Sequence, residues 1–464
     1  MVFSSFSFIF VFLPIVLAIY FLVKDKYKNI CICIASLIFY AWGEPKNIIL
    51  MLLSVLVNYW FAIYIGKQEG KKKKLLLVLD IIFNIGIMGF FKYANFIINN
   101  INAVFSTNIE NVKATLPIGI SFYTFQILSY IIDVYRGKVK VQKNIIKLCT
   151  YVALFPRLVQ GPIVRYEDAE YQLEHRKESF DKFIAGLKRF IYGLGKKVLI
   201  ANNVAFITQT IYQTNPTNGT ILLWLGAIAY TLQIYFDFSG YSDMAIGLGK
   251  MFGFDFMENF NYPYIAKSIT DFWRRWHISL STWFRDYVYI PLGGNRVSKI
   301  KLVRNLFIVW ALTGLWHGAN WNFIIWGIYY AILLIIEKLV LNKVIEKLPN
   351  VVKHIYALFF IVIGWVIFRT EDLSQLMLIL KNMFIYTPAN VIEYILSSWN
   401  VKIGLLFMIP AILFSVPFFM DKMKKNENKN SIYILNNVIV CCIFVLSIVQ
   451  LLIQTYNPFI YFNF

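Results

Sequence analysis

The stretch that decides the fold runs from Leu302 to Val340 and reads LVRNLFIVWALTGLWHGANWNFIIWGIYYAILLIIEKLV. One membrane-spanning helix needs roughly 20 mainly apolar residues, so a stretch of about twice that length predicts two helices joined by a turn. Gly318 marks the expected turn, which leaves the first helix about 15 residues and roughly 22 Å. Because the hydrocarbon core is roughly 30 Å thick, we expect the turn and the neighbouring His317 to lie below the membrane surface, in a protein-lined cavity.

His317 is therefore the first candidate functional residue. An ionisable ring at membrane depth is costly to bury unless it has partners, so such a residue indicates a functional site. The alternative is a neutral histidine that joins two helices through hydrogen bonds.

The composition of the whole chain is that of a membrane protein. Of the 464 residues, 59% are hydrophobic and only 15% are charged. An ordinary globular domain is about a quarter charged, so a soluble protein, a disordered chain, a disulfide scaffold and a coiled coil are excluded. The formal net charge is +20, but the basic residues form short clusters between apolar runs. Such clusters set membrane orientation, and we expect no nucleic-acid partner.

Apolar windows of spanning length recur along the chain. They predict an all-α, polytopic integral protein of the plasma membrane with about eleven or twelve spans, in one membrane domain over residues 1–464. The windows are Phe6–Val23, Ile30–Trp42, Ile48–Ile65, Leu75–Phe91, Leu116–Tyr135, Phe190–Tyr212, Ile221–Phe252, the pair in Leu302–Val340, Ile355–Phe368, Ile403–Met420 and Ile432–Ile453. Two prolines interrupt Tyr151–Val164, which predicts a re-entrant or interfacial segment. Lysines 24, 26 and 28 are expected in the cytoplasm and the N-terminus outside.

Residues 270–287 form the second candidate, a predicted interfacial helix. At about 100° per residue, its large apolar side chains fall on one arc: Trp273, Trp276, Leu280, Trp283, Phe284 and Tyr287. The basic side chains outside this arc are Arg274, Arg275 and Arg285. They suit lipid phosphates or an anionic substrate such as the phosphates of coenzyme A. Thr270 is the expected N-cap, and His277 lies at the edge of the arc, where its simplest interpretation is an interface anchor.

The third candidate is the polar stretch Tyr235–Met244, which sets Asp237 and Asp243 inside an apolar run. Carboxylates at membrane depth face a cavity or a partner, so we expect both to pair with arginines of the following segment and to shape the cavity. Ser239 lacks the surroundings of a nucleophilic serine. Zinc-type cysteine spacing and glycine-rich phosphate or dinucleotide motifs are missing, so we expect neither a metal nor a bound cofactor.

Motifs along the chain resemble the membrane-bound O-acyltransferase family. The matching segments are residues 3–6, 39–42, 116–126, 155–163, 237–243, 259–264, 273–287, 289–296, 314–321 and 459–462. They cover essentially the whole chain. Within the family, the length and the segment Pro291–Arg296 are most similar to the branch that contains the alginate O-acetyltransferase membrane subunit and relatives that acetylate peptidoglycan or bacterial cellulose.

The resemblance implies a fold and an activity. The fold is a ring of tilted and broken helices around a thinned centre, with a tunnel that joins a cytoplasmic acyl donor to an outside acceptor. In this family two histidines form the functional pair, and they match His277 and His317. His317 would act as general base or form an acyl-histidine intermediate, and the sequence leaves both open. Because they adjoin His317 in the sequence, Asn320, Trp316 or the backbone N–H groups near Gly318 are the candidates for stabilising the oxyanion.

The implied reactants follow from the same resemblance. His277, Trp276 and the three arginines would line the side of the donor, which is acetyl-CoA or another acyl thioester acting as a co-substrate. The implied partners, besides the lipid bilayer, are an extracytoplasmic acetyltransferase protein and a polysaccharide acceptor.

Two other functions stay open on the sequence. D-alanyl transfer to teichoic acid is the alternative within the family. A polysaccharide flippase or transporter is the alternative from another class, supported by the many spans and by Asp237 and Asp243. No internal repeat or inverted pair of broken helices is visible, which counts against a transporter.

Overall fold

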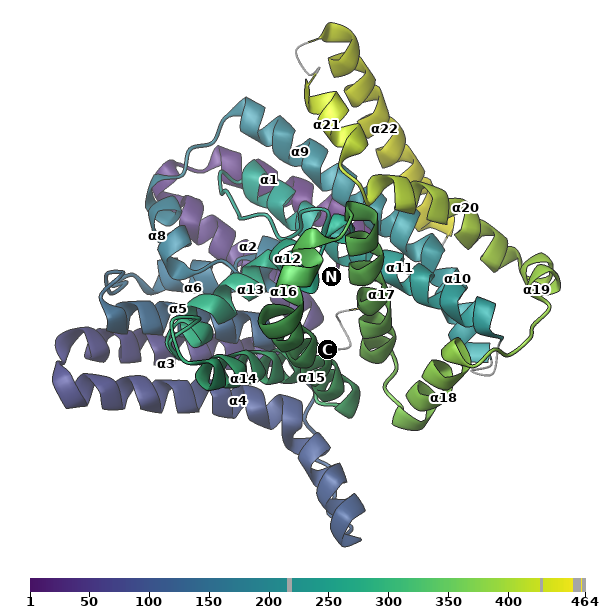
Figure 1. Ribbon diagram of the computed structural model, residues 1–464. Helices are drawn as coiled ribbons and strands as arrows, with labels where there is room; N and C mark the ends of the chain where they lie inside the picture. The colour runs from purple at the N-terminus through teal and green to yellow at the C-terminus, as the bar shows by residue number, and fades with distance from the viewer. Residues whose placement is uncertain (215–218, 426–428, 454–459, 461–464) are drawn as a thin grey trace. The chain divides into compact units, whose positions relative to one another are not determined.

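The computed structural model is helical, and its described part contains no β-strand (Figure 1). The described residues are 1–214, 219–425, 429–453 and 460. They form two compact units. The first unit comprises Met1–Leu187 and Ala245–Met257, and the second comprises Lys188–Met244 and Glu258–Phe464. A single membrane domain over residues 1–464 stays a prediction.

The first unit contains the N-terminal helices. They are η1 (Ser7–Phe12), α1 (Leu13–Leu22), η2 (Asp25–Tyr27), α2 (Lys28–Gly43), α3 (Asn47–Lys67), α4 (Gly70–Phe105), α5 (Ile120–Arg136), α6 (Ile145–Ala153), α7 (Phe155–Leu158) and α8 (Tyr166–His175). Two long helices, α9 (Phe180–Gly195) and α11 (Thr220–Met251), have residues in both units.

The second unit contains the remaining helices. They are η3 (Lys196–Ala201), α10 (Asn202–Thr214), η4 (Pro263–Ile265), α12 (Ile269–Arg275), α13 (Ile278–Phe284), η5 (Arg285–Tyr289), α14 (Lys299–His317), α15 (Trp321–Ile336), η6 (Glu337–Leu341), α16 (Asn342–Lys347), α17 (Asn350–Arg369), α18 (Leu373–Phe384), α19 (Val391–Ser397), α20 (Trp399–Phe414), α21 (Phe418–Lys425) and α22 (Asn430–Ile453).

Seven helices within the described residues are long and apolar enough to cross a membrane. They are Asn47–Lys67, Gly70–Phe105, Phe180–Tyr212, Thr220–Met251, Trp321–Lys347, Asn350–Arg369 and Asn430–Ile453. An eighth results if α19 and α20, which meet at a bend of 102°, count as one broken span. The all-α, multi-pass membrane fold is confirmed. The count is below eleven because several apolar windows form short helices: α2 and α5 have 16 and 17 residues, against the roughly 20 that a span needs.

The segment Tyr151–Val164, predicted to be re-entrant or interfacial, has an irregular backbone. Helix α6 ends at Ala153, the four-residue helix α7 follows, and every residue of the segment is buried. Arg157 lies inside it and donates a hydrogen bond to the carbonyl oxygen of Tyr151. Irregular backbone inside a membrane protein needs such partners, because lipid offers none.

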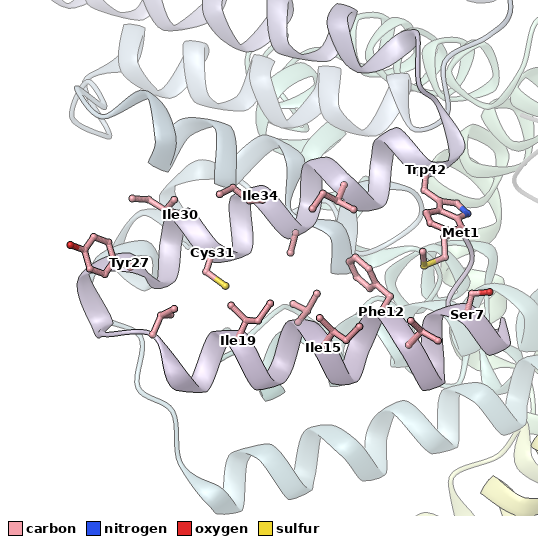
Figure 2. Close-up of a pocket in the computed structure, with 15 residues that line it drawn as sticks. Met1, Ser7, Phe12, Ile15, Ile19, Tyr27, Ile30, Cys31, Ile34 and Trp42 are labelled. Atoms are coloured by element: carbon pink, nitrogen blue, oxygen red, sulfur yellow. The ribbon is translucent and has the colours of Figure 1, made fainter.

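An apolar groove of about 610 Å³ lies between α2 and the helix formed by η1 and α1 (Figure 2). Figure 2 shows Ile19 of α1 and Cys31 of α2 on its two sides. Several side chains that line it are well exposed, with Ile15 and Ile34 each 53% accessible, whereas Phe12, Val16 and Ala35 are buried. A surface of this kind suits the hydrocarbon interior of a membrane and would be costly in water.

The helical hairpin predicted from residues 302–340 is confirmed, because α14 and α15 are joined by a three-residue turn and lie side by side (Figure 1). Gly314 and Gly327 allow the close approach. A Cβ at Gly314 would lie 2.4 Å from the carbonyl oxygen of Phe323, and a Cβ at Gly327 would lie 2.5 Å from that of Trp310. The backbones thus touch directly, and this contact fixes the turn.

Replacing Gly314 with alanine is expected to lower the thermal stability of the detergent-solubilised protein. The added methyl group must push α15 away, and overpacking of this kind costs about 1–3 kcal/mol of unfolding free energy. The matched control is Gly86→Ala on α4, where a Cβ meets no atom within 4 Å. Alanine at position 86 should leave the midpoint of thermal unfolding unchanged or raise it, because alanine favours helices. Equal midpoints for the two variants would contradict the close contact.

Candidate active site

The helix predicted over residues 270–287 is broken at His277. Helix α12 ends at Arg275 and α13 begins at Ile278, and His277 between them has a left-handed backbone with φ of +45°. Non-glycine residues adopt this conformation infrequently. The prediction of one continuous helix is therefore wrong, because it assumed an unbroken 3.6-residue period.

Two backbone hydrogen bonds hold this break. The N–H of Ile278 donates to the carbonyl oxygen of Asn259 at 2.9 Å, and the N–H of Asn261 donates to that of Arg275 at 2.9 Å. The segment at Asn259 thus binds the chain on both sides of His277. Local sequence could not reveal the break, because its cause lies sixteen or more positions away.

The N-terminus of α12 is also capped differently from the prediction. The Ser268 hydroxyl accepts a hydrogen bond from the N–H of Asp271 at 3.0 Å. The carboxylate of Glu337 accepts from the N–H groups of Ile269 and Thr270, at 2.8 and 2.9 Å. Thr270 as N-cap is wrong, because the helix starts earlier and a remote carboxylate binds its free N–H groups.

The aromatic arc of this segment is buried inside the protein. Trp276 is 1% exposed and contacts Trp365, Phe260 and Phe272, with ring centroids 4.7, 5.0 and 5.7 Å apart. The other members are also buried: Trp273, Leu280, Trp283, Phe284 and Tyr287. Helix α12 packs against α15 and α17, so its part of the arc contacts other helices, and the placement of the segment at the membrane interface stays a prediction.

His277 is almost fully buried, at 1% exposure. Its Nδ1 lies 3.2 Å from Oδ1 of Asn259. Its ring is perpendicular to that of Phe238, with centroids 4.7 Å apart, and lies 5.9 Å from the ring of Trp316. Burial lowers the pKa of His277 to about 3, so its imidazole is neutral at physiological pH. The interpretation as an interface anchor is wrong, because this side chain faces the protein interior.

His317 is the last residue of α14 and is 3% exposed. The rings of Trp316, Trp326 and Phe368 lie near it, with centroids 5.1, 5.0 and 5.2 Å away. All three are close to perpendicular to the imidazole. Trp316 therefore contacts both histidines, and the structure brings the predicted pair together around one indole.

The three arginines expected near the acyl donor reach the protein surface to different extents. Arg274 is exposed. Arg275 is half-buried and its Nε donates to Asp271 at 2.8 Å, whereas Arg285 is exposed and its Nε donates to Asp286 at 2.7 Å. Donor binding by these residues stays a prediction.

Asp243 and Asp237 are buried and paired, as expected, but with other partners than expected. Asp243 accepts hydrogen bonds from Nε of Arg189 at 2.8 Å and from Lys196 at 2.7 Å. Asp237 forms an ion pair with Lys197, and both side chains are 2% exposed. The prediction of arginines from the following segment is wrong, because the three cations come from α9 and η3, which precede α11.

The packing of α9 against α11 explains this pairing. A Cβ at Gly193 would lie 2.5 Å from the carbonyl oxygen of Gly240, so the two helices touch there. The basic residues lie about one helical turn from Gly193 and therefore face the carboxylates of α11. Arg189 also binds Glu258, at 2.6 and 3.0 Å, which fixes the loop just before Asn259.

The remaining predicted residues make no contact described above with His277 or His317. Asn320 precedes α15 and is half-buried, and its side chain makes no capping hydrogen bond to that helix. Of the C-terminal motif at 459–462, only Ile460 lies within the described residues, and its N–H donates to Asp237 at 2.9 Å. His175 is exposed and stacks on Tyr171, with centroids 4.7 Å apart.

The structure adds residues that the sequence did not single out. Asn259 stood inside a recognised motif, but no local pattern marks it as the partner of His277. Lys196 and Lys197 could have been found, because two charges interrupt the predicted span Phe190–Tyr212. Among residues 1–214, 219–425, 429–453 and 460, no group of three or more His, Cys, Asp and Glu side chains could hold a metal ion.

Comparison with known families agrees with this arrangement. Residues 138–380 match the family model of the membrane-bound O-acyltransferases. The chain belongs to this family. As a membrane-bound O-acyltransferase it is a multi-pass membrane enzyme, and the flippase or transporter alternative finds no support.

Three relatives show the range of this O-acyltransferase's similarities. The probable alginate O-acetylase of Azotobacter vinelandii is 40% identical over 100% of both chains. The peptidoglycan O-acetyltransferase of Helicobacter pylori is 35% identical over 82% of this chain and 80% of its own. The teichoic acid D-alanyltransferase of Bacillus subtilis is 35% identical, but over only 47% of this chain and 58% of its own.

The buried pair Lys197–Asp237 is expected to stabilise the O-acyltransferase only as a pair. Asp237→Leu leaves an uncompensated buried ammonium group and should cost about 3–5 kcal/mol of unfolding free energy. The double variant Lys197→Met with Asp237→Leu removes both charges and should recover most of that loss. Thermal unfolding of the solubilised variants measures the difference. A double variant that is less stable than Asp237→Leu would contradict this pairing.

Proposed function

We propose that this O-acyltransferase moves acetyl groups from cytoplasmic acetyl-CoA to an extracytoplasmic cell-wall or secreted polysaccharide, through a partner protein. The observation that carries the proposal is the packing of two buried histidines, His277 and His317, against Trp316. Full-length similarity to a probable alginate O-acetylase supports acetyl as the acyl group and a polysaccharide as the acceptor.

In the proposed reaction His317 is the general base. The oxygen of an acceptor hydroxyl attacks the carbonyl carbon of the acetyl thioester, and His317 takes the hydroxyl proton. The new C–O bond forms, the C–S bond breaks, and the proton passes from His317 to the sulfur of the leaving coenzyme A. An imidazole suits both steps because it both accepts and donates a proton.

The surroundings of His317 support this role. The rings of Trp316, Trp326 and Phe368 exclude water, so that a thioester there would meet the acceptor hydroxyl rather than water. The turn after His317 leads into the N-terminus of α15, where Asn320 lies and where the helix dipole supplies partial positive charge. We assign this end of α15 to the charge that develops on the carbonyl oxygen.

Arg274, Arg275 and Arg285 are assigned to the phosphates of coenzyme A. They lie on the segments that flank the His277 break, and Arg274 and Arg285 are exposed at the protein surface. Guanidinium groups bind phosphate through charge-assisted hydrogen bonds. The buried Trp276 supports this surface from inside, because it packs between α12 and Trp365 of α17.

His317→Ala is expected to abolish polysaccharide acetylation while the protein still accumulates in the membrane. Loss of a general base lowers the rate roughly 10²–10⁴-fold. The measurement is ester-linked acetate on envelope and secreted polymers from a deletion strain that expresses each variant. His175→Ala is the control and should restore acetylation fully, because His175 is exposed and lies outside the proposed site.

Two results would contradict the proposal. One is normal acetate release with His317→Ala. The other is a deletion strain that keeps its ester-linked acetate and loses ester-linked alanine, which would support D-alanyl transfer instead.

A further inference from the structure

Asn259 is buried, with no exposed surface, and lies at the centre of four hydrogen bonds. Its Oδ1 accepts from the backbone N–H of Ser279 at 3.2 Å and from the Ser279 hydroxyl at 2.9 Å. It also lies 3.2 Å from Nδ1 of His277. Its Nδ2 donates to the hydroxyl of Ser242 at 3.1 Å. The amide thus joins α11, the loop before η4 and α13 at one point.

These contacts determine which atom of each group carries a proton. A backbone N–H can only donate, so the Asn259 atom that faces the Ser279 N–H must be the carbonyl oxygen. That oxygen cannot donate, so Nδ1 of His277 must carry the proton that joins them. Because burial keeps this imidazole neutral, its other nitrogen, Nε2, carries a lone pair and no proton.

Nε2 of His277 is buried and has no hydrogen-bond partner among the described residues. A buried polar atom without a partner is costly, and proteins keep such atoms mainly where a ligand or water completes them. The left-handed backbone of His277 and the two flanking backbone bonds hold the ring in place without one. The left-handed backbone of His277 and the missing partner of its Nε2 together indicate that this nitrogen binds a group of a substrate.

We propose that Asn259 is a positioning residue that holds His277 in the Nδ1–H tautomer, so that Nε2 accepts a hydrogen bond from an O–H or N–H group of a substrate. This inference rests on the proposed function. The two histidines then have different roles: His317 transfers the proton, and His277 orients a reactant. In this tautomer His277 cannot donate to the oxyanion.

Two substrate groups fit this acceptor, the hydroxyl of the acyl acceptor and the amide N–H groups of the acyl donor's pantetheine arm. Steady-state kinetics of His277→Asn distinguish them. Asparagine tolerates the left-handed backbone, so the fold should persist. A rise in KM confined to the acceptor identifies the hydroxyl, and a rise confined to acetyl-CoA identifies the amide. Unchanged KM for both, with unchanged kcat, would overturn the proposal.

Most of the carboxylates on the elements around His277 form ion pairs with arginine or lysine side chains. The titratable groups on the surrounding elements are Tyr230, Tyr235, Asp237, Tyr241, Asp243 and Lys250 on α11, Glu258 before Asn259, Asp271, Arg274 and Arg275 on α12, Arg285, Asp286, Tyr287 and Tyr289 on η5, and Lys299, Lys301, Arg304 and His317 on α14. Asp237 is paired with Lys197. Arg189 binds both Asp243 and Glu258. Asp271 binds Arg275, and Asp286 binds Arg285. A new charge placed at position 259 would therefore act on His277 directly.

Nitrogen-15 NMR of histidine-labelled full-length protein in detergent tests the tautomer without any assay of activity. The chain has four histidines, so the His277→Asn spectrum assigns the His277 signals by their loss. We expect a neutral ring with a protonated Nδ1 and a bare Nε2. A protonated Nε2 in the wild-type protein would overturn the proposal. This readout stands even if the proposed acetyl transfer fails.

Asn259→Asp tests the same claim through the pH profile of acyl transfer. The aspartate keeps an acceptor for Nδ1–H but adds a negative charge, which raises the pKa of His277. As the pH falls through the raised pKa, Nε2 gains a proton and can no longer accept. The pKa of His277 should rise from about 3 by about 1–3 units, so we expect kcat of the variant to fall about tenfold as the pH drops to one unit below a midpoint of about 4–6, whereas His277 adds no acid limb there in the wild-type protein. An unchanged profile would contradict the proposal.

Epistasis separates positioning from simple structural support. Asn259→Leu should lower kcat about 10- to 100-fold in the wild-type background, by analogy with the residues that orient metal-binding histidines, and less than about twofold in the His277→Asn background. Ser279→Ala is the matched control, because it removes one donor to the same oxygen and leaves the histidine bond. The loss of kcat in Ser279→Ala should stay below about threefold, and His277 should keep the same tautomer as in the wild-type protein. Equal losses from Asn259→Leu in both backgrounds would overturn the proposal.

Discussion

The indole of Trp316 contacts both buried histidines, and its position depends on the backbone contact between α14 and α15. Gly314 and Gly327 let these helices approach until only backbone atoms separate them. The tight hairpin fixes the turn after His317 and brings the aromatic rings of α15 and α17 around the imidazole. A wider separation would admit water or lipid to the surroundings of His317, where the proposed acyl transfer requires that water be excluded.

A second constraint is that each polar group inside an apolar helical protein needs a partner. Asp237 and Asp243 obtain theirs from the basic residues of η3 and α9. His277 obtains one from Asn259, and the N-terminus of α12 obtains one from Glu337. Nε2 of His277 is one of several buried polar atoms without a hydrogen-bond partner among the described residues, and the His277 ring lies 5.9 Å from the indole of Trp316 in the candidate site.

Much of the fold and of the candidate site could be predicted from the sequence. The predictions that were wrong have identifiable physical causes. The hairpin predicted from the segment length is found and His317 is buried, but α14 has 19 residues instead of about 15, so the position of the turn below the membrane surface stays a prediction. The break at His277 could not be predicted, because periodicity assumes a continuous helix and the backbone bonds from Asn259 and Asn261 are remote. The partners of Asp237 and Asp243 were sought on the wrong helix, since chain order does not tell which neighbour packs closest. Asn259 carries no local signal, because a lone asparagine in a loop is most often a turn residue.

The central claim is that an acetyl group leaves a thioester in the pocket shared by His317 and Trp316. The most direct measurement is the initial rate at which radiolabelled acetyl from acetyl-CoA enters polysaccharide in membrane vesicles that contain the partner proteins and the polymer. The account predicts label transfer with the wild-type chain and loss of at least about a hundredfold with His317→Ala at equal protein abundance. A wild-type rate in vesicles that carry His317→Ala would contradict it.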